Sequence, residues 1–128
     1  MTDTKIKEIV DEINGAFARN DTESFLKHCT ESIRWNMVGH KTTSGKESIR
    51  AFLEEMKCPE PPVFSVDKMF LTSSSAVCCG DMTMKDPDGA EMSYSYCDIY
   101  EFTGDKVSEM LSYVIRHQDA GTTDAVAA

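Results

Sequence analysis

Apolar residues recur every three or four positions over the first twenty residues, a spacing that places them along one side of an α-helix. We therefore predict a helix from Thr4 to Arg19. Asn20 and Asp21 interrupt this spacing, and Asp21 is a suitable N-cap for a second, short helix from Thr22 to His28. The same periodicity returns from Gly45 to Met56 and predicts a third helix, which ends at a segment that contains three prolines.

The remaining apolar segments alternate with polar residues or form short apolar runs, as β-strands do. The polar segment from Gly39 to Ser44 is predicted to be a loop. Turn-forming residues at 72–75, 86–89 and 103–106 separate the later strands. The predicted strands are Ile33–Val38, Val63–Leu71, Ala76–Lys85, Ala90–Phe102 and Val107–Arg116.

Helices followed by consecutive strands are typical of an α+β fold, in which the helices cover one face of an antiparallel sheet. A chain of 128 residues is long enough for one domain with a single hydrophobic core. We assign residues 1–117 to this domain. Residues 118–128 are small and polar, and we predict that they form a flexible tail.

The composition is that of a soluble globular protein, with 41% hydrophobic and 27% charged residues. The formal net charge is −9, and no cluster of lysine or arginine offsets it locally. Such a charge repels phosphate groups, so nucleic acid and anionic membrane surfaces are not expected partners. No apolar run approaches the roughly 20 residues of a membrane span.

The N-terminus lacks the apolar segment of a signal peptide, and the five cysteines are an odd number. Both features predict reduced thiols and a cytoplasmic location. The cysteines form no Cys-x-x-Cys pair and the histidines are scattered, so neither a metal site nor a cofactor is predicted. Cys78 and Cys79 must point to opposite faces of a regular strand, and we expect Cys78 to lie beside Cys97 as a buried thiol.

Asp98 is the most unusual position in the chain, because it is the one acid in a row of aromatic residues and methionine. Alternate side chains of a strand share a face. An apolar environment raises the pKa of a carboxyl group, so we predict that Asp98 is a general acid/base with Tyr94 and Tyr96 as hydrogen-bond partners. The alternative is a structural carboxyl that is hydrogen-bonded to a tyrosine or to Trp35. The residues that share the face of Asp98 are Met92, Tyr94, Tyr96, Tyr100 and Phe102.

Asp81 is a second candidate acid, and its orientation depends on the preceding strand's register. If the turn at 86–89 closes an even loop, Asp81 lies opposite Tyr94 and shares a face with Asp98. The two carboxyls would then form an acid and base pair. A single bulge would instead turn Asp81 to solvent.

Three segments of the sequence follow one another in a characteristic order. They are Asn20-Asp21 after the first helix, Gly45-Lys-Glu-Ser-Ile-Arg-Ala-Phe in the third helix, and Asp98-Ile-Tyr-Glu-Phe followed by Asp105-Lys-Val. Together they resemble the SnoaL-like branch of the nuclear-transport-factor-2-like superfamily, whose members commonly carry Gly-Asp, Gly-Arg-Glu-Ala-Ile, and Asp-x-Phe-Arg-Phe with Gly-Lys-Ile. The resemblance covers about residues 4–117. It implies a cone of helices packed into a strongly curved sheet, with a pocket at the wide end.

Three activities of similar proteins can be compared with the residues of this chain. In ketosteroid isomerase, the resemblance places Asp98 at a catalytic position, but Ile13 stands where the family has a tyrosine and Met37 where it has the general base. In the comparison with limonene-epoxide hydrolase, this chain keeps one aspartate of the family pattern as Asp81 and has Ser112 in place of the second aspartate. Neither chemistry is therefore predicted.

SnoaL-type aldol cyclases are the third comparison. Asp98 and Glu109 match acidic residues of that family, whereas Met110 replaces its histidine and Ser112 its second aspartate. One acid/base group survives, which is sufficient for a proton transfer.

The resemblance also implies which side chains line the pocket, although each could equally be part of a filled core. His40 is placed near the mouth of the pocket, in a polar loop. Methionines are adaptable in packing and suit an apolar ligand. The predicted lining is Ile13, Phe17, Trp35, Met37, His40, Phe52, Met56, Met110, Ser112 and Val114.

We therefore predict a protein that binds a small, apolar, carbonyl-type ligand and acts as a cofactor-free isomerase, cyclase or dehydratase through Asp98. The alternative is a non-catalytic module that uses the same cavity for binding or dimerisation. The outer face of the sheet is predicted to be apolar, and a homodimer is the expected way to cover it. The residues of that face are Ser93, Ser95, Cys97, Ile99, Leu111, Tyr113 and Ile115.

Overall fold

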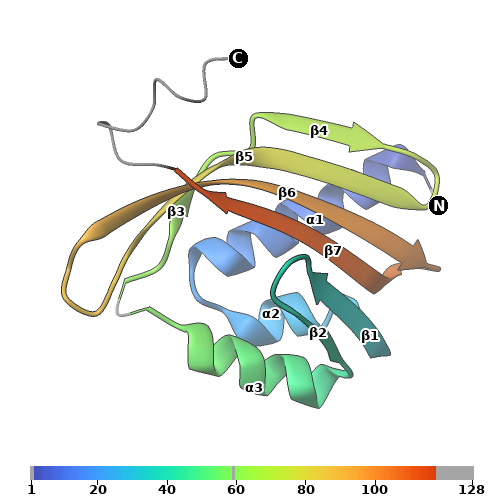
Figure 1. Ribbon diagram of the computed structural model, residues 1–128. Coiled ribbons are helices and arrows are strands. Elements are labelled where there is room, and N and C mark those ends of the chain that lie inside the picture. The colour runs from blue at the N-terminus through green and yellow to red at the C-terminus, as the bar shows by residue number, and fades with distance from the viewer. Residues whose placement is uncertain (1, 59, 118–128) are drawn as a thin grey trace.

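A curved sheet lies over three helices in the computed structural model of the protein, which describes residues 2–58 and 60–117 (Figure 1). The α+β fold predicted from the sequence is confirmed. The helices are α1 (Asp3–Ala18), α2 (Thr22–Leu26) and α3 (Lys46–Met56). The strands are β1 (Cys29–Met37), β2 (Lys41–Ser44), β3 (Val63–Phe64), β4 (Lys68–Leu71), β5 (Ser75–Lys85), β6 (Glu91–Thr103) and β7 (Lys106–Arg116).

Side-chain caps set the starts of the first two helices. Thr2 accepts a hydrogen bond from the backbone N–H of Lys5, and Asp21 accepts one from the backbone N–H of Ser24. These bonds satisfy N–H groups that have no partner within the first turn of a helix. Asn20, which has a positive φ of 56°, directs the chain from α1 into the cap of α2.

The strands form one mixed, unclosed sheet in the order β2-β1-β7-β6-β5-β3, and β4 also pairs with β5. All pairs are antiparallel except β1 with β7. The long strands β5, β6 and β7 bend over α1 and α2, and α3 lies beside the short hairpin of β1 and β2 (Figure 1). This curvature leaves a concave inner face toward the helices and a convex outer face.

Two segments differ from the prediction. The polar residues 41–44, predicted to be a loop, form β2, because they pair with β1 and no apolar periodicity is needed at the edge of a sheet. The predicted strand Val63–Leu71 is two strands, β3 and β4. Between them, the backbone N–H groups of Ser65 and Asp67 bond to carbonyls of β5, so the chain remains attached to β5 but leaves the regular ladder.

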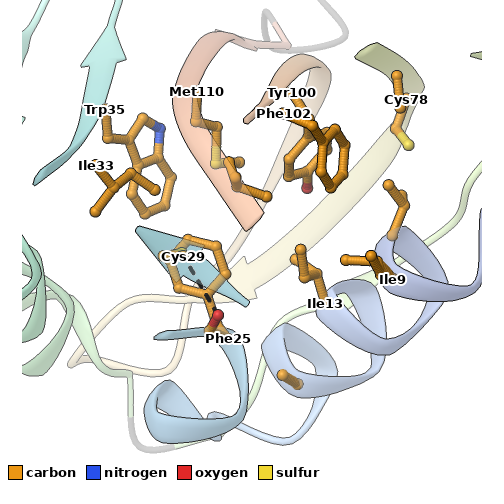
Figure 2. Close-up of a cluster of buried hydrophobic side chains, with 14 of the residues drawn as sticks. Ile9, Ile13, Phe25, Cys29, Ile33, Trp35, Cys78, Tyr100, Phe102 and Met110 are labelled. Atoms are coloured by element: carbon orange, nitrogen blue, oxygen red, sulfur yellow. Dashed lines mark hydrogen bonds between the residues drawn. The ribbon is translucent and has the colours of Figure 1, made fainter. Parts of the chain in front are cut away.

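The core lies between α1, α2 and the inner face of the sheet. Ile9 and Ile13 of α1 point toward Tyr100 and Phe102 of β6, and Phe25 of α2 points toward the β1 side (Figure 2). The alternation of strand side chains explains this arrangement, because every second residue of β5, β6 and β7 faces the helices. The predicted tail at 118–128 lies outside the described residues.

None of the helices in the described ranges is long and apolar enough to cross a membrane.

Candidate functional site

A cavity of about 220 Å³ lies between the inner face of the sheet and the helices. Its wall comes from the three helices, from β1, β3, β5, β6 and β7, and from the segments that link α1 to α2 and α3 to β3. Most of the wall is apolar and unusually rich in methionine. The apolar side chains include Phe17, Trp35, Met37, Leu53, Met56, Phe64, Met82, Met84, Tyr96 and Met110.

Seven of the ten predicted lining residues lie on this wall. They are Phe17, Trp35, Met37, Met56, Met110, Ser112 and Val114. Ile13 does not, because it is fully buried in the core between α1 and the sheet. His40 is exposed in the turn between β1 and β2.

Phe52 lies behind the cavity wall. Its ring packs edge-on against Trp35 with the centroids 6.2 Å apart, and the Lys41 ammonium lies 4.5 Å from its centroid on the other side. Phe52 therefore supports Trp35 and faces a separate surface depression beside β2.

Asp98 lies at the deep end of the cavity, in the middle of β6. Its neighbours across the sheet are Cys78 of β5 and Ser112 of β7. Burial raises the pKa of the Asp98 carboxyl to about 6, and a hydrogen bond from Ser112 opposes part of this rise. Asp98 is thus a carboxyl that exchanges its proton near neutral pH.

A chain of hydrogen bonds fixes the orientation of this carboxyl. The indole Nε1–H of Trp35 donates to the hydroxyl oxygen of Ser112 over 2.9 Å, and both residues are buried. Since the Ser112 oxygen accepts from Trp35, its own proton is free to be donated to Asp98. Ser112 therefore links Asp98 to the wall of the cavity.

Asn14 is the functional candidate that the sequence reasoning missed. Its side chain lines the cavity, and its buried amide nitrogen has no hydrogen-bond partner of good geometry among the described residues. Its contact with the Cys78 sulfur, which opposes part of the rise in the pKa of that thiol, is a weak one because sulfur is a poor acceptor. An unpaired buried donor is unfavourable unless a ligand or water completes it. The signal was present in the sequence, since Asn14 lies within the apolar side of the first helix, four residues after Val10 and three before Phe17.

Asp21 on the wall and Cys78 beside Asn14 do not titrate near neutral pH as Asp98 does. Asp21 lines the cavity, but its carboxylate caps α2 by bonding to Ser24, and these bonds lower its pKa. Cys78 is completely buried next to Asn14, and burial raises the pKa of its thiol to about 11. Asp98 is therefore the carboxyl of the wall that titrates near neutral pH.

Asp81 does not join Asp98, and the predicted acid pair is wrong. The connection between β5 and β6 has five residues, 86–90, because Lys85 pairs with Glu91. An odd loop shifts the register by one residue from the even loop that was expected, and such a shift moves a side chain to the other face. Asp81 pairs with Ser95 and is exposed on the outer face, where its Oδ1 accepts a hydrogen bond from the Ser95 hydroxyl at 2.8 Å.

The same shift corrects the cysteine pairing. Cys79, and not Cys78, lies beside Cys97 on the outer face. Cys78 instead lies on the inner face, toward the helices, where Asp98 is its neighbour on the adjacent strand.

The two tyrosines predicted to assist Asp98 have other partners. The Tyr96 hydroxyl donates to the Ser65 carbonyl oxygen at 2.6 Å, which holds the segment before β4 against the sheet. The Tyr94 hydroxyl contacts the Met92 sulfur at 3.6 Å, and Tyr94 is not part of the cavity wall. Tyr96 contributes its ring to the wall, and its hydroxyl serves the structure.

The arrangement thus places one titratable acid and one unpaired amide donor in an apolar cavity. Among residues 2–58 and 60–117, no group of three His, Cys, Asp or Glu side chains is arranged to hold a metal ion.

Comparison with known proteins agrees with this fold. The SnoaL-like domain family matches residues 10–110. An NTF2-like protein of unknown function from Cytophaga hutchinsonii is 27% identical, with a TM-score of 0.73 over 90% of this chain and 100% of the other. No curated protein matches.

Two more distant structures share the fold. A proposed polyketide cyclase from Xanthomonas campestris is 11% identical, with a TM-score of 0.77 over 87% of this chain and 90% of the other. A proposed ketosteroid isomerase from Kribbella flavida is 12% identical, with a TM-score of 0.76 over 98% of this chain and 89% of the other. By the match over residues 10–110, which includes most of the residues that line the cavity, the chain belongs to the SnoaL-like domain family.

Proposed function

We propose that this protein binds a small, largely apolar carbonyl compound in the cavity and moves a proton next to its carbonyl group, with Asp98 as the general acid/base. The observation that carries the proposal is that Asp98, whose pKa is raised to about 6, and the buried amide of Asn14 both line one largely apolar cavity. A catalytic group works best when its pKa lies near the working pH.

The two polar groups have complementary roles in this chemistry. The Asp98 carboxylate takes a proton from the carbon beside the carbonyl group, and the electron pair of that C–H bond moves toward the carbonyl oxygen. The Asn14 amide donates a hydrogen bond to the developing oxyanion, as a donor placed where charge develops in the transition state. Asp98 then returns the proton. Isomerisation, ring closure and dehydration all begin with this step.

The wall favours a compact apolar ligand. The cavity is smaller than the 300–1,000 Å³ of typical drug-sized sites, so we expect a ligand of on the order of ten non-hydrogen atoms. Five methionines, at positions 37, 56, 82, 84 and 110, can adapt to an irregular apolar shape.

Exchange of solvent deuterium into 2-tetralone, followed by NMR, tests the proposal. The protein should accelerate exchange at the carbons beside the carbonyl group, and Asp98→Asn should reduce the acceleration by about 10² or more. Asp81→Asn is the matched control, because it makes the same change on the outer face. Equal loss in both variants, or full activity in Asp98→Asn, contradicts the role of Asp98.

Asn14→Leu tests the second group, since leucine has nearly the shape of asparagine but no donor. We expect exchange to fall by about tenfold to 10³-fold, as when an oxyanion donor is removed. An unchanged rate in this variant would show that Asn14 does not contact the carbonyl oxygen.

A non-catalytic binding module is the second candidate, and the occupants of two positions favour it. Ile13 and Met37 stand where similar enzymes have catalytic groups, and Ile13 is sealed in the core. Trp35 is the one tryptophan of the chain and lines the cavity, so its fluorescence reports binding of 2-tetralone directly. Binding without exchange in the wild-type protein supports the binding module.

A further inference from the structure

Cys79 and Cys97 lie side by side on the outer face of the sheet, away from the cavity. They are direct partners across β5 and β6, and the Cys79 thiol donates to the Cys97 sulfur over 3.3 Å. Both residues are half-buried, in contrast to the fully enclosed Cys78. The outer face therefore carries a pair of adjacent thiols that the proposed chemistry of the cavity does not use.

Backbone hydrogen bonds show which of the two kinds of antiparallel residue pair Cys79 and Cys97 form. The Cys79 carbonyl accepts from the N–H of Asp67, so the polar backbone groups of Cys79 point away from β6. On β6, the Ser93 carbonyl accepts a hydrogen bond from the backbone N–H of His117, just after β7, and so points away from β5. The direction of the backbone groups alternates along a strand, so those of Cys97, four residues later, also point away from β5. The two cysteines thus form a non-hydrogen-bonded pair, in which Cα atoms lie about 4.5 Å apart and side chains are closest.

This spacing suits a covalent bond. Disulfides join Cα atoms that are about 4.4–6.8 Å apart, with an S–S bond of about 2.05 Å. The sulfurs must approach by roughly 1.2 Å from their present 3.3 Å, which small rotations about the two Cα–Cβ bonds can supply. No shift of strand register is needed.

We propose that Cys79 and Cys97 are a modification site that forms a reversible intramolecular disulfide when the protein meets a low-molecular-weight disulfide such as oxidised glutathione. The Cys79 thiolate attacks one sulfur of the reagent, forms a mixed disulfide and releases one thiolate. The Cys97 thiolate then attacks the Cys79 sulfur and releases the second thiolate. The two thiol protons pass to the two released thiolates, so two thiols and one disulfide become one disulfide and two thiols.

The environment of the pair makes the exchange slow at neutral pH and faster in base. Burial and the hydrogen bond with Cys79 raise the pKa of the Cys97 thiol to about 11, and only a thiolate attacks. The new bond would lie on the outer side of the strand pair whose inner side carries Asp98.

Peptide mapping after oxidation tests the proposal. The full chain is incubated with oxidised glutathione at pH 8, free thiols are blocked with a maleimide, and the denatured protein is cleaved with trypsin. Cleavage after Lys68, Lys85 and Lys106 places Cys78 and Cys79 on one peptide and Cys97 on the next. We expect these two peptides, 69–85 and 86–106, to be joined within one chain, and dithiothreitol to separate them.

Single variants identify the sulfurs. Cys97→Ser should stop at a mixed disulfide of glutathione on Cys79, and Cys79→Ser should lose the link between the peptides. Cys58→Ser, which removes a thiol outside the sheet, should retain the link. The proposal is overturned if wild-type protein forms no link, if the link joins two chains, or if it persists in Cys79→Ser.

Discussion

The carboxyl of Asp98 lowers the stability of the folded protein at neutral pH. Its pKa is about 6 in the cavity against an ordinary value of 3.8, so the folded protein holds this proton more tightly than the unfolded chain does. Folding stability therefore falls as the pH rises from about 4 to about 6, and the loss remains above that range. A shift of this size corresponds to about 3 kcal/mol. A residue kept at such a cost fits a functional site.

Replacement by a neutral side chain of the same shape should remove this cost. We expect Asp98→Asn to raise the free energy of unfolding by up to about 3 kcal/mol at pH 8, and to change it little at pH 4, where the native carboxyl is already protonated. Urea denaturation at the two pH values measures the difference. Asp81→Asn should show no such pH-dependent gain, and an equal gain for Asp98→Asn at both pH values would contradict the assignment.

The same pKa predicts the pH dependence of the proposed proton transfer. As a general base, Asp98 acts in its charged form, so the rate of deuterium exchange should rise about tenfold per pH unit below about 6 and level off above it. A pH–rate profile from pH 4.5 to 8 measures this. A profile that is flat across this range assigns the proton transfer to another group.

At the scale of elements, the contact between β5 and the segment before β4 closes one side of the cavity. Gly80 of β5 is buried, and a Cβ atom at this position would overlap the Ser65 carbonyl oxygen and press on the Tyr96 hydroxyl that binds it. Glycine is therefore needed here for the close approach of two backbones, although its φ is ordinary. The hydrogen bond from Tyr96 and the absence of a side chain at Gly80 together allow the backbone of Ser65 to lie close against β5.

We expect Gly80→Ala to destabilise the protein by about 1–3 kcal/mol, because the backbone of Ser65 must move. Gly15→Ala is the matched control. It lies inside α1, where a Cβ atom meets only the flexible end of Arg19, and it should stabilise by about 0.5–1 kcal/mol. Urea denaturation distinguishes the two signs, and a stabilising Gly80→Ala would refute the close-contact explanation.

At the scale of the whole molecule, no helix among residues 2–58 and 60–117 covers the outer face of the sheet. Ile115 is 68% exposed, Phe70 60% and Tyr113 42%. Phe70, Val77, Ile99 and Leu111 lie in one row across β4, β5, β6 and β7. A continuous apolar surface of this kind favours association.

We expect two copies to pair reversibly through this face, so that Cys79 and Cys97 remain accessible in the separated copies, and light scattering after gel filtration of a concentrated sample to give twice the chain mass of 14.3 kDa. Ile115→Asp should give monomers by placing a charge on the outer face. Val114→Asp should remain dimeric, because this neighbouring side chain points to the cavity. Monomeric wild-type protein would contradict the prediction.

The amino-acid sequence by itself determined the local structure. The start of α2 at Asp21 follows from a capping residue, the long strands follow from alternation, and Asp98 was identified as an acid in an apolar row. These features depend on neighbours within a few positions, and such interactions can be recognised in the pattern of residues. The match over residues 10–110 agrees with the fold that the resemblance implied.

Only the tertiary structure decided which side chains meet. One extra residue in the loop at 86–90 turned Asp81 outward and brought Cys79 to Cys97, while the alternating pattern of both strands stayed the same. Asn14 and Asp98 are far apart in the chain, and their placement on the wall of one cavity depends on how α1 packs against the sheet. The strand register and the helix packing depend on many small interaction energies over the whole sheet. The residues that make up the site are therefore determined by the assembled fold and not by the sequence of α1, β5 or β6 alone.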